Sequence, residues 1–194
     1  MATQSNAPSA SASAPSSTPD TIVPKSYAKG VAMTSDPWEE CATLEYGGDR
    51  SFARSIHEQV VYAAGSEHGA IEDQLLRTLA LPQCTDAARA FLCQMLALVG
   101  SARSVPALVP LLRDPKTTEA ARFALEAIPG PEADSGLRGA LDALEGNPKA
   151  GLIGSLAARR DQAARPALAA IKDNPKEPEV VRDAAARALA AITD

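Results

Sequence analysis

The chain has 194 residues and a formal net charge of −5; 45% of its residues are hydrophobic and only 4% are aromatic. This composition provides enough apolar side chains for one folded core, which must be built mainly from Ala and Leu. The acidic balance argues against nucleic-acid binding, because phosphate recognition needs a basic face and stacking aromatic side chains. No stretch approaches the ~18 consecutive apolar residues of a membrane span, so we expect none.

The first 36 residues differ in composition from the rest. From Met1 to Asp20 nearly every residue is Ala, Ser, Pro, Thr, Asn or Gln, a mixture that buries too little apolar surface to offset the entropy cost of ordering. We therefore expect residues 1–36 to be a disordered tail or tether and residues 37–194 to form one domain. The basic and apolar regions of a secretory signal are missing from this segment, which predicts a cytoplasmic location. The alternative is a periplasmic or membrane-tethered protein, if a signal or anchor was removed ahead of the tail.

Helix signals begin at Asp36-Pro37, where a polar capping residue precedes Pro at the first helical position. The predicted helix covers residues 37–46 and ends at Gly47-Gly48. Its Trp38, Leu44 and Tyr46 are expected to cover the end of the domain, as atypical terminal repeats do.

The remaining helices are predicted from apolar spacing and from Gly and Pro turns. Residues 51–64 and 68–81 each show one apolar face, and residues 86–99 are apolar nearly all round, which places that helix at the centre of the domain. Further helices are predicted over residues 103–113, 117–128, 132–144, 148–160, 162–172 and 178–192. Pro106, Pro110 and Pro166 are expected to bend the helices that contain them.

A degenerate repeat of roughly thirty residues organises the later helices. A Leu stands three residues before the residue that closes each second helix, with spacings of 29, 31 and 33: Leu96, Leu125, Leu156 and Leu189. The closing positions themselves hold Val99, Ile128, Arg159 and Ile192. The intervening first helices carry a Leu series of their own, at Leu108, Leu137 and Leu168. Repeats of this length indicate a solenoid of stacked helix pairs.

The last copy, from Val181 to Asp194, reads Val-Arg-Asp-Ala-Ala-Ala-Arg-Ala-Leu-Ala-Ala-Ile-Thr-Asp. It is similar to the HEAT-repeat family, specifically to the short bacterial HEAT-like repeats that also occur in phycobilin lyase subunits. The stretch from Cys93 to Asp161 further resembles HEAT-repeat proteins of planctomycete and verrucomicrobial bacteria, although Thr118 and Lys149 replace the Arg of the pattern. The resemblance implies an all-α fold, a right-handed α-solenoid of stacked antiparallel helix pairs, and a binding scaffold as its use.

Residue types that catalyse reactions or bind metals are not grouped in the sequence. His57 and His68 lie on different predicted helices without a further ligand at metal spacing. Cys84 and Cys93 are too far apart for a disulfide if the chain between them is helical. Cys84 precedes a helix N-terminus, which makes it the better candidate for a reactive thiol. We predict no metal, no cofactor and no enzymatic activity.

A binding site is predicted at the variable position of the repeat, which points off the concave wall formed by the second helices. This position is filled by Gln94, Phe123, Gly154 and Arg187. We expect Phe123 to be an exposed aromatic side chain that contacts a partner. The alternative is that Phe123 packs on the next repeat.

Arg159 and Arg160 add two positive charges where the family closes the helix with an apolar residue. Gln94, Phe123, Arg159, Arg160 and Arg187 are therefore the predicted partner-binding residues. The alternative for the Arg pair is that it compensates the helix dipole and contacts Asp161.

Two functions follow from these patterns. The first is a non-catalytic scaffold that holds another protein on its concave wall. The second, implied by the resemblance, is a lyase-like subunit that cradles a tetrapyrrole or similar ligand. Such a cradle needs a deep apolar pocket with convergent polar groups, whereas the candidate wall is mostly Ala and Gly, so the scaffold is favoured. The last repeat ends without a polar cap, which predicts a partner stacking there or self-association at that end, unless the chain continues.

Overall fold

The computed structural model describes residues 36–192, which contain α-helices and short 3₁₀ turns and no strand. The all-α class predicted from the sequence is confirmed. The described residues belong to one compact unit. The predicted tail, apart from Asp36, lies outside the described residues.

The unit begins with α1 (Pro37–Ala42), α2 (Ser51–Tyr62) and α3 (His68–Leu79). The Asp36 carboxylate accepts the backbone N–H of Trp38, as its capping position predicts. Helix α1 is shorter than expected, because Thr85 donates to the carbonyls of Ala42 and Leu44 and draws the chain off the helical path. The following loop carries Tyr46 outward, where it is 72% exposed, so the prediction that Tyr46 covers the end of the domain is wrong. Trp38 and Leu44 are buried as expected.

The later helices alternate between two types. We call α2, α4 (Asp86–Val99), α6 (Thr118–Ala127), α8 (Gly146–Ala158) and α10 (Glu179–Ala191) the second helices. The first helices are α3, α5 (Val105–Leu108), α7 (Pro131–Gly139) and α9 (Arg165–Asp173). Several first helices adjoin 3₁₀ turns, which accounts for their being shorter than predicted: Ala102–Ser104, Val109–Arg113, Leu141–Ala143 and Gln162–Ala164.

The prolines stand where the helix type changes. Pro106, Pro110 and Pro166 are each the second residue of an α-helix or 3₁₀ segment, within the helical runs of residues 102–113 and 162–173. Proline is tolerated there, because the N–H that it lacks would have no partner inside the segment. The regular α-helical pattern is therefore interrupted beside each Pro, and whether the axis bends there stays a prediction.

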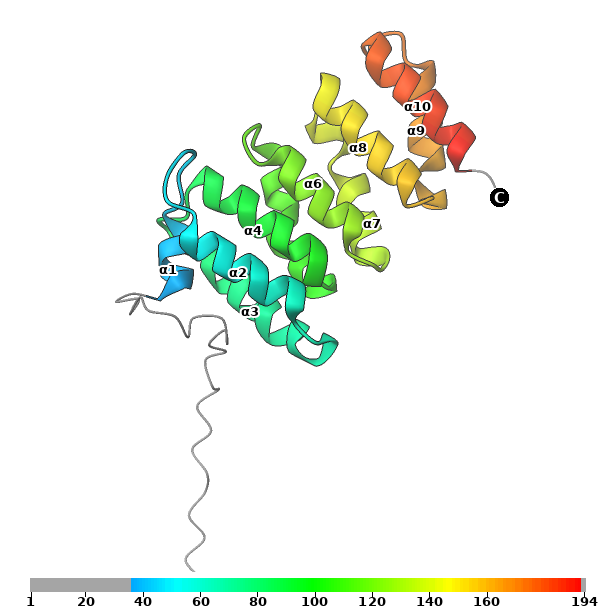
Figure 1. Cartoon of the computed structure of the whole chain (residues 1–194). Helices are drawn as coiled ribbons and strands as arrows, with labels where there is room; N and C mark the ends of the chain where they lie inside the picture. The colour runs from blue at the N-terminus through cyan, green and yellow to red at the C-terminus, as the bar shows by residue number, and fades with distance from the viewer. Residues whose placement is uncertain (1–35, 193–194) are drawn as a thin grey trace, which may run out of the picture. The chain divides into compact units, whose positions relative to one another are not determined.

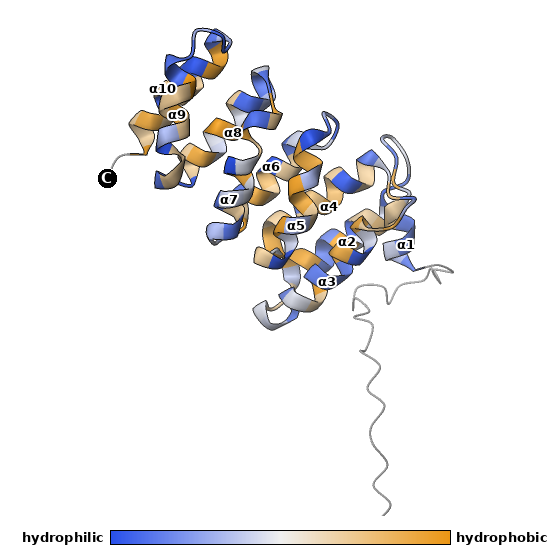
Figure 2. Ribbon diagram, turned by 180° about the vertical axis from the view of Figure 1, so that it is seen from behind, coloured by the Kyte–Doolittle hydropathy of each residue, from blue (hydrophilic) through white to orange (hydrophobic). Residues whose placement is uncertain are grey.

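The second helices lie side by side in one row, and each contacts the next (Figure 1). Figure 2, seen from behind, shows the first helices on the other side of this row. Helix α3 packs on α4, α5 on α6, α7 on α8 and α9 on α10. The repeated leucines fill the space between the two layers, since Leu96, Leu125 and Leu156 are fully buried, as are Leu108, Leu137 and Leu168. Each contributes about 1.5–3 kcal/mol of burial free energy.

Polar side chains join successive repeats. Lys116, before α6, pairs with Asp86 of α4 at 2.7 Å, and Lys149 of α8 pairs with Glu177 at 2.5 Å. Lys149 and Thr118 are the two residues that replace Arg in the repeat pattern. The Thr118 hydroxyl instead donates to the carbonyls of Leu112 and Asp114. A different contact thus ties the chain at each position where the pattern departs from Arg.

The most buried of these contacts between repeats is made by Glu72 of α3. Its carboxylate, 2% exposed, accepts the N–H of Ser101 at 2.8 Å and the Ser104 hydroxyl at 2.6 Å, at the start of the next repeat. Burial raises the pKa of the Glu72 carboxyl, but the hydrogen bonds from Ser104 and Ser101, together with the Arg103 guanidinium, lower this pKa by more. The net pKa is below the ordinary value of Glu.

We predict that Glu72→Gln reduces the pH dependence of folding stability. A carboxylate whose pKa is lower in the folded than in the unfolded chain stabilises the fold fully above the unfolded pKa, and this stabilisation is lost as pH falls through the folded pKa. The parent should therefore lose more stability than the variant below about pH 5. At pH 7 the variant should be about 1–3 kcal/mol less stable. Urea unfolding at a series of pH values measures both effects. Glu58→Gln, at an exposed pair with Arg54, is the matched control, and equal pH slopes for parent and Glu72→Gln would contradict the role of Glu72.

Candidate protein-binding face

Apart from Tyr46 in the loop after α1, the exposed large apolar side chains of the described residues lie on helices of one layer. Those that lie on helices are Val61, Tyr62, Leu98, Phe123 and Val180, on α2, α4, α6 and α10. Within residues 36–192 none lies on a first helix. Single exposed apolar residues are ordinary on a soluble protein, but their collection on one layer marks an interaction surface.

This layer presents two rows of equivalent positions, one helical turn apart. The first row is the variable position of the repeat, and all four of its residues are exposed: Gln94, Phe123, Gly154 and Arg187. The second row is also exposed and holds Leu98, Ala127, Ala158 and Ala191. We call these eight positions on α4, α6, α8 and α10 the second-helix face. The predicted exposure of Gln94, Phe123 and Arg187 is confirmed.

The register of these rows agrees with the ends of the helices. The C-cap residues of α6, α8 and α10 are Ile128, Arg159 and Ile192. Their spacings of 31 and 33 are those of the two rows. Leu189, the last of the core leucines, is only half-buried, because no described helix lies beyond α10 to cover it.

Phe123 is held from below by a buried cation. It is 57% exposed, and the Arg122 guanidinium lies 4.2 Å from the centre of its ring. Arg122 is in turn fixed by Glu119 at 2.6 Å and by Ser155 of α8 at 2.8 Å. The exposure of Phe123 agrees with the expectation of an aromatic side chain that a partner can reach, more than with the alternative that it packs on the next repeat. A fixed cation under an exposed ring limits the freedom of both side chains and prepares the ring for contact.

Gly154 occupies the equivalent position on the neighbouring helix α8. A Cβ atom built there would meet no heavy atom within 4 Å. The face therefore has a projecting aromatic ring on α6 and bare backbone beside it on α8. This alternation of a projection and a flat surface is specific to the pair α6 and α8.

Arg159 does not lie on the face. Its side chain is 11% exposed, and its Nε donates to Asp134 at 2.5 Å. The Nη1 atom donates to the carbonyls of Glu126 and Ile128 at 2.8 and 2.6 Å, and Nη2 to that of Gly130 at 2.9 Å. These carbonyls belong to the last turn of α6 and to the residues just after it, which lack intrahelical donors. Arg159 thus serves the fold by capping the preceding repeat, and we remove it from the predicted partner-binding residues.

Arg160 is exposed, but it does not form a basic patch with Arg159, whose side chain is turned to Asp134. Its φ of 54° is left-handed. The N–H of Arg160 donates to the carbonyl of Ala157, and the N–H of Asp161 to that of Leu156, which is the Schellman ending of a helix. Asp161 pairs with Arg138, so the predicted contact of the Arg pair with Asp161 is not formed through its side chain. The two arginines that the sequence placed together have separate roles.

The described cysteines are buried. For Cys84, the candidate reactive thiol, burial raises the pKa although Arg89 opposes the shift, which disfavours the thiolate. Burial raises the pKa of Cys41 and Cys93 to about 12. Among residues 36–192 no group of three or more His, Cys, Asp or Glu side chains could hold a metal ion.

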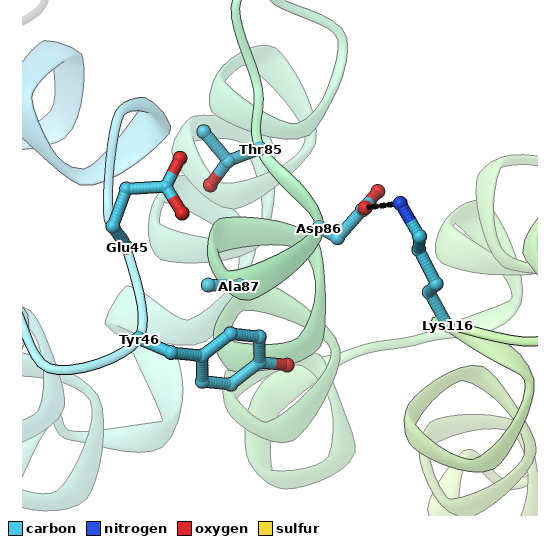
Figure 3. A pocket seen from close by; sticks show the side chains of 6 residues that line it. All are labelled: Glu45, Tyr46, Thr85, Asp86, Ala87 and Lys116. Atoms are coloured by element: carbon cyan, nitrogen blue, oxygen red, sulfur yellow. Dashed lines mark hydrogen bonds and ion pairs between the residues drawn. The ribbon is translucent and has the colours of Figure 1, made fainter.

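Two of the hollows on the surface of residues 36–192 are large enough to consider as ligand sites. One, of about 620 Å³, lies beside the N-terminal end of α4 and is lined by Glu45, Tyr46, Thr85, Asp86, Ala87 and Lys116. Figure 3 shows the Tyr46 ring beside Ala87, and the Lys116 ammonium turned to the Asp86 carboxylate. The other, of about 560 Å³, lies between α5 and α7. Both are open hollows rather than enclosed pockets.

Sequence reasoning missed Leu98 as a surface residue. It is 56% exposed although it stands in α4, a helix that is apolar nearly all round. The signal was its position one turn after Gln94, on the same side of α4. Tyr62 was missed because it stands at the last position of α2, where no periodicity continues.

No protein-family model, curated protein or solved structure matches this chain. The helices described in residues 36–192 include none that is long and apolar enough to span a membrane.

Arg159 and its neighbour give a matched test of the capping role. Arg159→Ala leaves backbone carbonyls of α6 and the Asp134 carboxylate without their donor, so we expect the free energy of unfolding to fall by about 2–4 kcal/mol. Arg160→Gly relieves a left-handed backbone at the adjacent position, and its effect should lie between none and a gain of about 1 kcal/mol. Urea unfolding measures both. A loss at Arg160 that exceeds the loss at Arg159 would refute the capping role.

Proposed function

We propose that this protein is a non-catalytic interaction scaffold, a right-handed solenoid of HEAT-like antiparallel helix pairs that binds another protein on its second-helix face. The observation that carries the proposal is that the exposed large apolar side chains on helices all belong to second helices. A chain whose surface served solubility alone would have no reason to place them on one layer.

The chemistry of the second-helix face suits a protein partner. Interfaces are enriched in aromatic side chains at their centre and depleted of charge there. Phe123 and Leu98 project from the face among Ala and Gly positions, while the Arg122 charge beneath the ring is paired with carboxylates. A partner can therefore cover the centre of the face without leaving an unpaired charge buried, which would be costly.

The family resemblance supports the same function, because stacked helix pairs expose one continuous layer along the repeat. The contacts between α4 and α6, α6 and α8, and α8 and α10 agree with such stacking. The lyase-like alternative needs a deep apolar pocket with convergent polar groups, and neither cavity described above has this form. A partner that stacks on the end of α10 remains a further prediction.

We predict that Leu98→Ser combined with Phe123→Ser abolishes partner binding and leaves the fold intact, because both side chains are more than half exposed. The tagged full chain is used to capture proteins from a lysate of its native host, and retained proteins are quantified by mass spectrometry. A protein held by the parent should be reduced at least tenfold with the double variant, since central aromatic and apolar anchors contribute more than about 1.4 kcal/mol.

Tyr46→Ser is the matched control for that experiment, because Tyr46 is the exposed aromatic residue of the loop before α2 and lies off the face. Equal melting temperatures of the variants exclude unfolding as the cause. A partner that the double variant retains and Tyr46→Ser loses would place the binding site at the loop and contradict the proposal.

A further inference from the structure

The three cysteines of the chain come together in one part of the core. Cys41 lies in α1, Cys84 in the turn before α4, and Cys93 within α4. Each is at most 4% exposed. Burial is the main cause of the raised pKa of Cys41 and Cys93, and electrostatic repulsion from Cys84 is the second cause for both. Cys84 therefore lies near each of the other two thiols.

Hydrogen bonds hold the backbone beside Cys41 against the backbone beside Cys84. The N–H of Thr85 donates to the carbonyl of Ala42 at 2.9 Å, and its hydroxyl donates to the carbonyl of Leu44. Thr85 and Ala42 are the residues that directly follow the two cysteines. Backbone segments joined by such bonds lie about 5 Å apart, and a disulfide joins Cα atoms that are about 4.4–6.8 Å apart. Because both side chains are buried in the same core, this spacing suits a bond between their sulfur atoms.

Cys93 cannot replace Cys41 as the partner of Cys84. It lies in the middle of α4, a regular helix that begins at Asp86. A helix rises about 1.5 Å per residue, so Cys93 stands roughly 10 Å along the axis from Asp86, and Cys84 precedes Asp86 by a further two residues. This separation exceeds the reach of a disulfide. Cys93 should therefore stay a thiol.

The surroundings of Cys84 make it the sulfur that reacts first. Burial raises the pKa of the Cys84 thiol, but the Arg89 guanidinium opposes this rise by its charge and by a hydrogen bond. A neighbouring cation favours the thiolate, which is the form that attacks a disulfide. Since Cys41 and Cys84 are both covered in the folded unit, their reaction takes place while the six-residue helix α1 is undocked.

We infer that Cys41 and Cys84 form a disulfide under oxidising conditions, which locks α1 to the turn before α4. The oxidant is a low-molecular-weight disulfide, for which glutathione disulfide is the probe. The Cys84 thiolate attacks one glutathione sulfur and displaces the other glutathione as a thiolate. The Cys41 thiolate then attacks the Cys84 sulfur and displaces the second glutathione. Two cysteine thiols are thus oxidised to one disulfide, one glutathione disulfide is reduced to two thiols, and the two protons pass from the cysteines to the glutathiones.

The disulfide would join α1 to a turn that follows α2 and α3 in the chain. A cross-link over a segment of this length restricts the unfolded chain and stabilises the folded one. The pair lies in the core and not on the second-helix face, so the inference does not rest on the proposed function. It also separates the two locations that the sequence left open, because such bonds persist in oxidising compartments and are reduced in the cytoplasm.

The test counts the thiols of the full chain after refolding with glutathione disulfide and glutathione, or with glutathione alone. Free thiols are alkylated in urea and counted by mass spectrometry. Of the three thiols of the parent, one should remain after oxidative refolding, and digestion without reductant should yield the Cys41 peptide linked to the Cys84 peptide. Cys93→Ala is the matched control, since it removes the third thiol and should still form the same linked peptide.

Urea unfolding then tests whether the disulfide locks the fold. The unfolding midpoint of the parent and of Cys93→Ala should be higher after oxidative refolding than after refolding with glutathione alone. Cys41→Ala and Cys84→Ala should show no such difference. If an alanine variant does not fold, the thiol count, the linked peptide and the midpoint of the parent decide the question.

The other outcomes overturn the inference. A parent that keeps three thiols has no disulfide, and a peptide linked through Cys93 assigns the bond to a different pair. A glutathione adduct that stays on Cys84 shows that Cys41 does not reach the mixed disulfide. A bond between two chains, seen as a doubled mass without reductant, excludes the pairing within one chain. A linked peptide without a change in the unfolding midpoint excludes the lock on α1.

Discussion

The structure depends on one constraint, which is that the free backbone groups at the ends of its helices need partners. Neighbouring repeats supply several of them. Arg159 reaches the carbonyls at the end of α6, Glu72 accepts a backbone N–H at the start of the next repeat, and Thr85 meets carbonyls after α1. Arg165 of α9 donates to the carbonyl of Ile192 that ends α10. Contact between neighbouring repeats therefore supplies hydrogen bonds to free backbone groups and also buries the core leucines. Each repeat depends on its neighbour for both.

This use of polar side chains decides which surface remains for binding. Many of the charged residues described here act between repeats and are paired, such as Lys149 with Glu177 and Arg138 with Asp161. In the layer of second helices, Arg122 lies between helices and bonds to Ser155. The outward positions on α6 and α8 are left to Phe123, Gly154 and Ala, while Gln94 and Arg187 stand at the outward positions of α4 and α10. The face carries little charge because many charged side chains are used in ion pairs and hydrogen bonds between repeats.

The sequence predicted the helix order and the core because leucine spacing and Gly or Pro turns are local signals. It did not predict Arg159, since a residue at a helix end gives no local sign of whether it turns to solvent or to the preceding repeat. The prediction that Tyr46 covers the end of the domain was wrong for a related reason. Hydrogen bonds from Thr85, some forty residues later in the chain, end α1 early. The exposure of Phe123, Gln94 and Arg187 was predictable, because it followed from the repeat register alone.

One sequence signal could have placed Arg159, and it lies in the repeat before it. The turn after α6 reads Pro129-Gly130-Pro131, and the two prolines have no N–H to offer the carbonyls around them. A donor must come from elsewhere, and a guanidinium carries five N–H groups in a fixed fork. The apolar Ile128 and Ile192 close α6 and α10, and at the equivalent position only α8 carries Arg. This departure from the repeat pattern therefore answers a departure in the neighbouring turn, and it removes from the second-helix face the charge of Arg159 that the sequence had assigned to it.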